Sequence, residues 1–125
     1  MTHEEVQQWL DDYISAWASN DPEAIGALFS EEVEYSYRPW KSEKHTVRGR
    51  EAIVSSWLED PDDPSGWEAA YAPYVVEGDK AVAIGWTKYE AAGEHPQRTY
   101  HNAYLLRFED GVCAEFAEFY LLEKE

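Results

Sequence analysis

The spacing of apolar residues changes along this chain from a helical period to a strand period, which limits the folds open to it. In the first twenty residues, apolar positions recur with the three- and four-residue spacing of one helix face. They are Val6, Trp9, Leu10, Tyr13, Ile14 and Trp17. Residues 2–5 (THEE) have the form of a capping box, and Asn20 interrupts the stripe. The pattern therefore predicts an amphipathic helix between these two signals.

Two more helices and one strand are expected before the middle of the chain. Asp21 and Pro22 combine a capping side chain with a proline at the first helical position, which predicts a second helix. Its expected buried residues are Ala24, Ile25, Leu28 and Phe29. A third helix should follow Gly49. The residues expected to face inward from it are Ala52, Ile53 and Trp57. Between these helices, residues 32–40 alternate apolar and polar side chains, as a strand does.

The second half of the chain follows the two-residue period of β-strands. Residues 67–93 are predicted to form two strands joined by Gly-Asp at 78–79, and residues 98–123 two more joined by Asp-Gly at 110–111. Helices followed by long antiparallel strands are typical of an α+β fold, with the helices packed on one face of the sheet. We expect a single domain over residues 1–125. Its sheet must curve to cover the helices, which leaves a cavity between the two layers.

The charge of the chain argues against several classes of partner. Its 125 residues include 10 basic and 26 acidic side chains, which gives a net charge of −16. Phosphate groups are bound through Lys and Arg, so neither nucleic acids nor anionic membrane surfaces are expected as partners. No apolar run reaches the length of a membrane span, and no secretory leader is recognised. We therefore expect a cytoplasmic protein.

Motifs for metals, cofactors and nucleophiles are not found in the sequence. The histidines His3, His45, His95 and His101 show no metal-ligand spacing. A phosphate-binding loop and a nucleophile elbow are also missing. The single cysteine, Cys113, has no partner for an intrachain disulfide and is expected to be buried and unreactive. The sequence thus predicts neither a metal nor a cofactor.

Three segments carry a resemblance to a known family. They are ALFSEEVEY at 27–35, VRGREAIVSSW at 47–57 and LLRFEDGVCAEFAEFY at 105–120. In this order and spacing the chain resembles the nuclear transport factor 2-like superfamily, in particular its SnoaL-like branch. The resemblance implies a cone, in which a strongly curved antiparallel sheet wraps around three N-terminal helices and leaves a pocket at the open end. It also implies a homodimer formed through the outer face of the sheet, as in many members.

The family includes isomerases, cyclases, dehydratases, epoxide hydrolases and binding domains, so the fold alone does not name an activity. Ketosteroid isomerase chemistry needs a carboxylate base and a protonated carboxyl group in an oxyanion hole. The resemblance puts Tyr37 and Tyr104 at these two places, and neither is an acid. SnoaL-like cyclases use an Asp and a His, but Leu121 stands where that Asp would be. His101 would point away from the pocket if Tyr104 points into it, unless a bulge reverses the strand.

One carboxylate remains as a candidate for acid–base chemistry. Glu118 shares a strand face with Phe116, and the resemblance puts this face inside the cone. The expected pocket residues are Tyr13, Trp17, Tyr35, Tyr37, Trp57, Asn102, Tyr104, Phe116 and Glu118. Burial among aromatic side chains should raise the pKa of Glu118, which suits a general acid or base near neutral pH. Alternatively, Glu118 only accepts hydrogen bonds and shapes the pocket.

Three functions remain open. The first is a pocket that binds an apolar or aromatic small molecule. The second is a SnoaL-like enzyme (an isomerase, cyclase, dehydratase or hydrolase) that uses Glu118 as its general acid or base. The third is a non-catalytic dimeric association domain whose pocket is filled by side chains. Ala117, Phe119 and Leu121 are expected on the outer face of the sheet, where a partner subunit of the homodimer should cover them.

Overall fold

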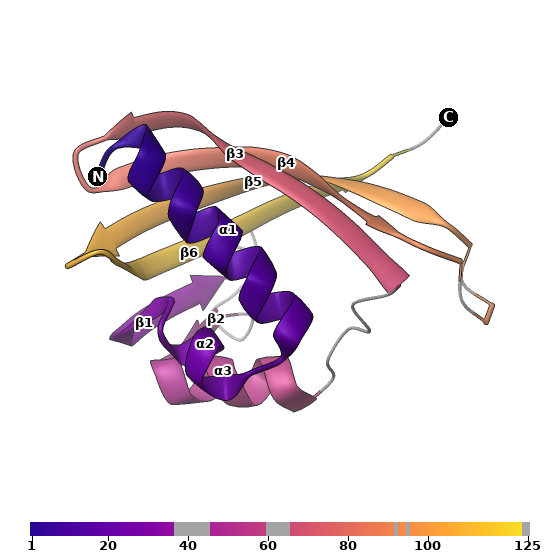
Figure 1. Cartoon of the computed structure of the whole chain (residues 1–125), viewed down its shortest axis with the longest axis horizontal. Coiled ribbons are helices and arrows are strands. Elements are labelled where there is room, and N and C mark those ends of the chain that lie inside the picture. The colour runs from indigo at the N-terminus through magenta and orange to yellow at the C-terminus, as the bar shows by residue number, and fades with distance from the viewer. Residues whose placement is uncertain (37–45, 60–65, 92, 95, 124–125) are drawn as a thin grey trace.

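The computed structural model describes residues 1–36, 46–59, 66–91, 93–94 and 96–123. These ranges form three helices and six strands. In chain order they are α1 (His3–Ser19), α2 (Pro22–Gly26), β1 (Phe29–Ser36), β2 (Thr46–Arg48), α3 (Arg50–Glu59), β3 (Trp67–Glu77), β4 (Lys80–Tyr89), β5 (Arg98–Glu109) and β6 (Val112–Leu122). Figure 1 shows the helices on one side of the sheet, so the predicted α+β class is confirmed. None of the helices in these ranges is long and apolar enough to span a membrane.

Helix α1 begins and ends at its predicted capping residues. The Thr2 hydroxyl accepts a hydrogen bond from the Glu5 backbone N–H at 3.1 Å, and the Glu5 carboxylate accepts one from the Thr2 N–H at 2.9 Å. Asn20 closes the helix in the left-handed conformation, with a φ of 54°. The buried residues of the helix are Val6, Trp9, Leu10, Tyr13 and Ala16. The predicted apolar stripe therefore packs against the sheet, where β3 is its main contact.

Helix α2 is shorter than predicted. The Asp21 side chain caps it, but the helix spans only Pro22–Gly26. Leu28 and Phe29 are buried as expected, yet Phe29 begins β1 and does not continue the helix. The Leu28 carbonyl accepts a hydrogen bond from the Cys113 backbone N–H at 2.9 Å, and Phe29 pairs with Cys113 across the sheet. This pairing with a distant strand makes residue 29 the start of a strand. The sequence around residue 28 contains no local signal for it.

Helix α3 buries fewer of its predicted residues than expected. Ile53 is fully buried and Trp57 is half-buried, whereas Ala52 is exposed, so the prediction for Ala52 is wrong. The helix packs on α2 and β1 at one margin of the sheet. Because only one side of it is covered, a narrow row of its positions reaches the core.

The sheet is mixed, so the prediction of an antiparallel sheet is wrong at one strand pair. Its strand order is β2-β1-β6-β5-β4-β3, and every neighbouring pair is antiparallel except β1 and β6, which run parallel. The short strand β2 was not predicted from the sequence. It pairs with β1 and sets Val47 opposite Tyr35. Alternation of side chains predicts a strand but carries no information about the direction of its partner.

Both predicted hairpins are confirmed. β3 and β4 are joined at Gly78-Asp79, and β5 and β6 at Asp110-Gly111. Asp110 and Gly111 both have positive φ values, 52° and 83°, as a tight hairpin turn requires. The register of β5 and β6 shifts directly after this turn, because Arg107 pairs with Glu115 whereas Phe108 pairs with Cys113.

This register shift changes the expected orientation of Cys113. Strict alternation places Cys113 on the outer face of the sheet, but the residue is fully buried in the hydrophobic core. Burial raises the pKa of the Cys113 thiol far above its ordinary value. The predicted buried cysteine is thus confirmed, although it lies on the opposite face from the one that alternation predicts. Beyond the shift the register is regular, and Tyr104 lies directly opposite Glu118.

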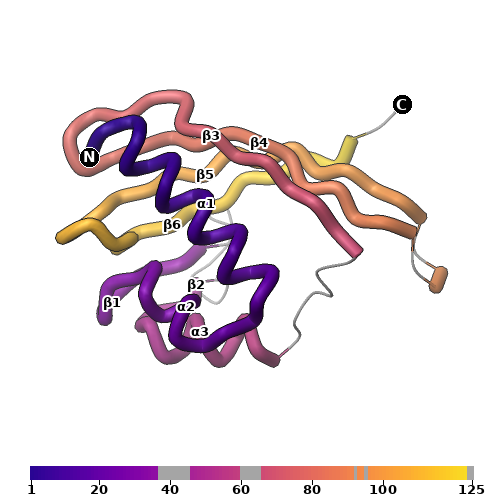
Figure 2. Tube along the Cα trace, viewed as in Figure 1, coloured from indigo at the N-terminus to yellow at the C-terminus, as the bar shows by residue number. Residues whose placement is uncertain are grey.

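The core lies between α1 and the concave side of the sheet. The tube view in Figure 2 shows β3 to β6 curving over α1, while α2 and α3 lie beside β1. Aromatic rings make up much of this core: Trp9, Tyr13, Phe29, Tyr104 and Phe116 are all buried there. Rings of Tyr13 and Phe116 are stacked, with centroids 5.7 Å apart. The sheet therefore curves around a core that consists largely of aromatic rings.

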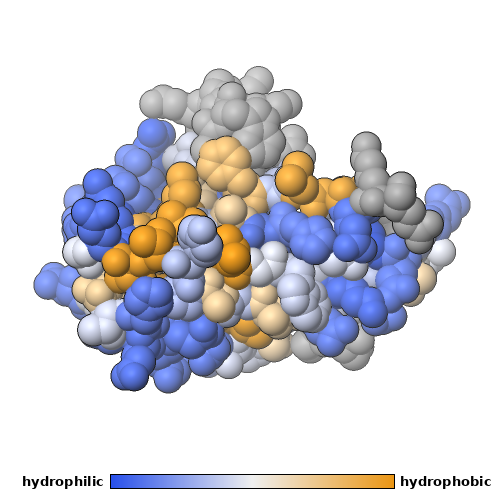
Figure 3. Space-filling view, turned by 90° about the horizontal axis from the view of Figure 1, so that it is seen from above, coloured by the Kyte–Doolittle hydropathy of each residue, from blue (hydrophilic) through white to orange (hydrophobic). Residues whose placement is uncertain are grey.

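The opposite, outer face of the sheet carries exposed apolar side chains. Figure 3, a view from above the strands of Figure 1, shows hydrophobic residues gathered between hydrophilic margins. Large exposed residues on this face are Val75, Ile84, Leu105, Phe119 and Leu121. Phe119 and Leu121, which alternation predicts on this face, are 41% and 75% exposed, and Ala117 is half-buried.

Candidate functional site

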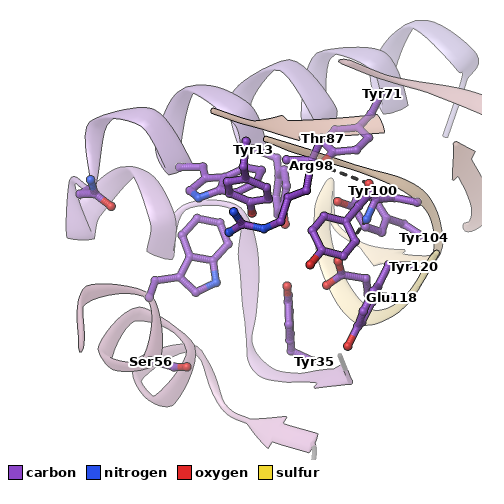
Figure 4. Close-up of a pocket in the computed structure, with 15 residues that line it drawn as sticks. Tyr13, Tyr35, Ser56, Tyr71, Thr87, Arg98, Tyr100, Tyr104, Glu118 and Tyr120 are labelled. Carbon is purple, nitrogen blue, oxygen red and sulfur yellow. Dashed lines mark hydrogen bonds between the residues drawn. The ribbon is translucent and has the colours of Figure 1, made fainter. Parts of the chain in front are cut away.

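A cavity of about 480 Å³ lies between the helices and the concave side of the sheet. Its described lining comes from α1, α3 and every strand except β2, together with Asn20 at the end of α1. Seven of the lining residues are tyrosines: Tyr13, Tyr35, Tyr71, Tyr89, Tyr100, Tyr104 and Tyr120. Figure 4 shows several of their hydroxyl groups directed toward the same space as the Glu118 carboxyl group.

Strand alternation explains how β5 contributes to this cavity. Arg98, Tyr100, Asn102 and Tyr104 are spaced two residues apart, so they share the inward face of the strand. His101 between them is exposed, and its Nε2 lies 3.0 Å from the Glu123 carboxylate. The prediction that His101 points away from the pocket is therefore confirmed, and an Asp/His pair of the cyclase kind is not formed by this residue.

Glu118 holds its carboxyl group at the inner end of the cavity. Its Oε1 accepts a hydrogen bond from Asn102 Nδ2 at 3.3 Å. Burial raises the pKa of Glu118 from 4.5 to about 7, although hydrogen bonds from Asn102 and Tyr35 act in the opposite direction by favouring the charged form. Desolvation thus outweighs the two donors, and the carboxyl group can both donate and accept a proton near neutral pH.

A chain of hydrogen bonds reaches Glu118 from three neighbouring strands. Thr87 Oγ1 donates to Asn102 Oδ1 at 3.3 Å, and the Tyr71 hydroxyl is hydrogen-bonded to Thr87 Oγ1. Because Thr87 has a single hydroxyl proton and gives it to Asn102, Tyr71 is the donor in its bond with Thr87. Every bond from Tyr71 through Thr87 and Asn102 therefore points toward the Glu118 carboxyl group. The dashed lines in Figure 4 mark bonds of this chain.

Gly85 makes room for the start of this chain. It lies opposite Tyr71 in the pairing of β3 and β4. A Cβ atom on Gly85 would overlap the Ala70 carbonyl oxygen and the Tyr71 ring, and would lie 2.8 Å from the Tyr71 Cα. A larger residue at position 85 would therefore displace β3 and the tyrosine hydroxyl that it positions.

The tyrosines nearest Glu118 are neutral at physiological pH. Burial is the main cause that raises the pKa of Tyr13, Tyr35, Tyr71 and Tyr104 above the ordinary value of 10. The nearby Glu118 carboxylate raises these four pKa values further, because a second negative charge beside it would be unfavourable. The neutral tyrosines therefore act as hydrogen-bond donors and not as bases: Tyr35 donates to Glu118, and Tyr71 donates to Thr87.

The outer part of the cavity contains a cation. The Arg98 guanidinium carbon lies 4.6 Å from the centroid of the Tyr89 ring. The Tyr89 and Tyr100 rings meet edge to face at 6.0 Å, and Tyr100 and Tyr120 do so at 5.8 Å. Arg98 and these three tyrosines line the cavity but were not among the predicted pocket residues. The two-residue spacing that puts Tyr100 on the same strand face as Tyr104 was a signal that could also have identified Arg98.

Most of the residues expected in the pocket lie around this cavity. They are Tyr13, Trp17, Tyr35, Trp57, Asn102, Tyr104 and Glu118. Phe116 is an exception, because it is buried behind the lining, where its ring stacks on Tyr35 at 4.5 Å. Tyr37 lies outside the described residues. Sequence reasoning missed Tyr71 and Thr87, whose inward orientation depends on the pairing of β3 and β4.

No metal centre is found in the described part of the chain. No group of three or more His, Cys, Asp or Glu side chains there could hold a metal ion. Two polar residues are nevertheless buried, Thr87 and Asn102, and both belong to the chain of hydrogen bonds that ends at Glu118. The arrangement is suited to hydrogen bonding and proton exchange by side chains.

Solved structures share this fold at low sequence identity. A nuclear transport factor 2-like protein of unknown function from Burkholderia xenovorans LB400 is 16% identical, with a TM-score of 0.72, over 98% of this chain and 87% of that one. A candidate ketosteroid isomerase from Kribbella flavida DSM 17836 is 17% identical, with a TM-score of 0.72, over 98% and 82%. An epoxide hydrolase from M. tuberculosis is 8% identical, with a TM-score of 0.68, over 95% and 84%.

These structures establish the fold and leave the activity open, because their identities to this chain are low. A comparison with curated proteins finds no match. The family model of the SnoaL-like domain matches residues 10–116, which include most of the cavity lining and all of the residues that bond to Glu118. The chain therefore belongs to the SnoaL-like domain family, and it shares the fold of nuclear transport factor 2-like proteins.

Proposed function

We propose that this domain binds a small, mainly apolar or aromatic molecule in the cavity. A volume of about 480 Å³ is within the range of about 300 to 1,000 Å³ that is usual for small-molecule sites. Aromatic side chains form much of the wall, and hydrogen-bonding groups converge on Glu118. Such a site can bury an apolar ligand and orient it through one polar group. The observation that carries this proposal is the open cavity in front of a hydrogen-bonded carboxyl group.

The position of this cavity agrees with the pocket that the family's cone-shaped fold implies at its open end. An association domain with a filled pocket is supported less well, because this volume is left free between α1, α3 and the sheet. Tyr13 and Phe116 do fill the inner end of the cone, but Arg98 and Tyr100 surround open space further out. Ligand binding therefore accounts for more of the site than association alone.

Acid–base catalysis by Glu118 is a second candidate function, and the pKa of its carboxyl group favours it. At a pKa of about 7, comparable amounts of acid and base are present at neutral pH. As a base, Glu118 would take a proton from a carbon beside a carbonyl group. The electron pair of that C–H bond would pass to the carbonyl oxygen, and a neutral tyrosine would donate a hydrogen bond to it. Return of the proton to carbon would complete the exchange.

One probe tests both functions. 2-Tetralone is an aromatic ketone of suitable size with an acidic C–H group beside its carbonyl. Calorimetric titration measures its binding, and proton NMR in D₂O measures exchange of its C–H protons. We expect the wild type to bind it and to accelerate exchange. Glu118→Gln should still bind it but lose exchange by roughly 100-fold or more. Glu115→Gln, on the outer face of the same strand, is the matched control.

The possible outcomes separate the two functions. Binding without accelerated exchange in the wild type would leave the binding function and remove this acid–base role. Exchange that persists in Glu118→Gln would show that another group carries the proton. A failure of 2-tetralone and of other bicyclic and tricyclic aromatic compounds to bind would contradict the binding proposal itself.

We also propose that the domain forms a homodimer through the outer face of the sheet. Cross-strand pairing there aligns small and large apolar residues, since Ile84 lies opposite both Ala72 and Ala103, and Ala103 lies opposite Phe119. Ile84 is 47% exposed and Phe119 is 41% exposed. A continuous apolar row across four strands is the kind of surface that a partner covers. A second copy of the same face would supply a matching row.

A further inference from the structure

We infer that Arg98 makes the outer part of the cavity a binding site for a carboxylate, so that the ligand is a small aromatic or apolar acid. This inference rests on the proposed binding function and names the class of ligand. Arg98 is the only cationic side chain among the described residues that line the cavity. Figure 4 shows it reaching from the end of its strand into the space that the tyrosines enclose.

The Arg98 side chain is positioned but keeps its hydrogen-bond donors available. Its guanidinium carbon lies 4.6 Å from the centroid of the Tyr89 ring, which is directly opposite Arg98 in the pairing of β4 and β5. Contact of this kind does not consume hydrogen-bond donors of the guanidinium group. Among the described residues none accepts a hydrogen bond from Arg98, so its N–H donors can bind both oxygens of a carboxylate. The Tyr89 ring thus reduces the entropy lost when a ligand binds.

Arg98 also lacks a carboxylate of its own in the described part of the chain. Arg48 and Arg107 have such partners, since Arg48 Nε lies 3.4 Å from Glu34 and Arg107 Nη1 lies 2.7 Å from Glu109. No carboxylate of a described residue, including that of Glu118, lies within 4.0 Å of the Arg98 guanidinium nitrogens. In a chain with 26 acidic residues, this leaves one cation facing the cavity with no acidic partner among the residues that the structure describes.

Arg98 and Glu118 line the cavity from different positions along the sheet, which bears on the shape of the ligand. Asn102, which donates to Glu118, is four residues from Arg98 on the same strand face, or about 13 Å along the strand. A ligand with its carboxylate at Arg98 would therefore extend an apolar or aromatic body past Tyr100 toward the inner end. A second polar group, such as a carbonyl oxygen, would meet Glu118 and the neutral tyrosines there. The two ends of the cavity thus recognise different chemical groups.

Matched pairs of aromatic acids and primary amides test this inference. The probes are phenylacetate, 1-naphthaleneacetate and 4-biphenylacetate, each compared with its amide by calorimetric titration at pH 7.5. The wild type should bind the acid of at least one pair roughly 10-fold more tightly than its amide. Arg98→Gln should remove this preference because it weakens binding of the acid more than binding of the amide, and the amide binding that remains verifies that the cavity is intact. Lys88→Gln makes the same change of charge at a residue that does not line the cavity, and it should keep the preference.

The possible outcomes separate a failure of the proposed carboxylate site from a failure of the proposed binding function. If the wild type binds amides as tightly as acids or more tightly, the inference is wrong while the binding function stands. Retention of the acid preference in Arg98→Gln would likewise overturn it. If neither member of any pair binds, the proposed binding function fails for aromatic ligands and the inference fails with it. The wild-type comparison needs no variant, so it remains decisive even if Arg98→Gln does not fold.

Discussion

Asn102 donates a hydrogen bond to Glu118 across the β5–β6 pair, with 3.3 Å between Nδ2 and Oε1. The same amide accepts a hydrogen bond from Thr87 through its oxygen, so the orientation of the Asn102 side chain is determined from both sides. Asn102 therefore fixes where the Glu118 carboxyl group lies in the cavity. The consequences for stability, for the pKa of Glu118 and for ligand binding can be measured separately.

The stability of the protein should depend on pH through Glu118. Because burial raises the pKa of the folded-state carboxyl group to about 7, the folded state binds more protons than the unfolded state between about pH 4.5 and 7. The contribution of Glu118 to the free energy of unfolding is therefore fully present below this pH window and is lost as the pH rises through it. Replacement by Gln removes the titrating group. The free energy of unfolding of Glu118→Gln minus that of the wild type should increase by on the order of 2 to 3 kcal/mol from pH 4 to pH 8.

Urea unfolding at a series of pH values measures this difference. Other titrating groups are common to both proteins and cancel when the two are compared. Glu115→Gln, which makes the same change at an exposed residue of the same strand, is the control variant. A constant difference between Glu118→Gln and the wild type from pH 4 to pH 8 would mean that Glu118 is not desolvated in the folded protein.

Removal of the Tyr35 hydroxyl should raise the pKa of Glu118 further. The hydrogen bond from Tyr35 favours the charged carboxylate and so opposes the effect of burial. Tyr35→Phe keeps the ring, which stacks on Phe116 at 4.5 Å, and removes only the donor. Carbon NMR of labelled Glu should report the upward shift. Tyr100→Phe is the control. Tyr100 lines the same cavity, but it is not one of the hydrogen-bond donors that lower the pKa of Glu118. A downward shift in Tyr35→Phe would contradict the assigned role of Tyr35.

Gly85→Ala should destabilise the protein and disturb the inner end of the cavity. The added methyl group would overlap the Ala70 carbonyl oxygen and the Tyr71 ring, and backbone atoms cannot move aside easily. We expect a loss of roughly 1 to 3 kcal/mol in the free energy of unfolding. Gly66→Ala is a matched control, because a Cβ atom at Gly66 would meet no atom within 4 Å. Equal stabilities of the two variants would show that β3 does not lie against Gly85 as described.

The outer face of the sheet should hold two copies of the chain together. Sedimentation of the wild type at micromolar concentration should give a dimer, and Ile84→Asp should give a monomer because it puts a charge in the centre of the apolar row. Ser55→Asp adds the same charge on the exposed side of α3 and should leave the dimer intact. A wild-type monomer, or a dimer that Ile84→Asp does not affect, would exclude this face as the interface.

Local signals were enough to predict some elements from the sequence. Helix α1 is delimited by the capping box at Thr2 and by Asn20, and its apolar stripe needs no distant partner to be recognised. The hairpin turns at residues 78–79 and 110–111 are likewise marked by their own residues. The inward orientation expected for Glu118 follows from alternation within one strand, combined with the family resemblance.

Other features depend on pairing between distant strands, which a single sequence does not report. Strand β2 and the parallel pairing of β1 with β6 belong to this group. The shift that buries Cys113 depends on how β5 and β6 are aligned after their turn. Tyr71 and Thr87 reach Glu118 only because the registers of four strands bring them together. The candidate carboxylate could therefore be chosen from the sequence, whereas the hydrogen bonds that position it could not.

The pKa of Glu118 in the wild type tests the central claim most directly. Carbon NMR titration of the labelled side chain measures it, and Glu118→Gln identifies the signal by its loss. We predict a midpoint near pH 7, as expected for a carboxyl group buried among tyrosines and able to exchange a proton with a bound molecule. A midpoint near the ordinary value of 4.5 would contradict this account, because the carboxylate would then be solvated and permanently charged at neutral pH.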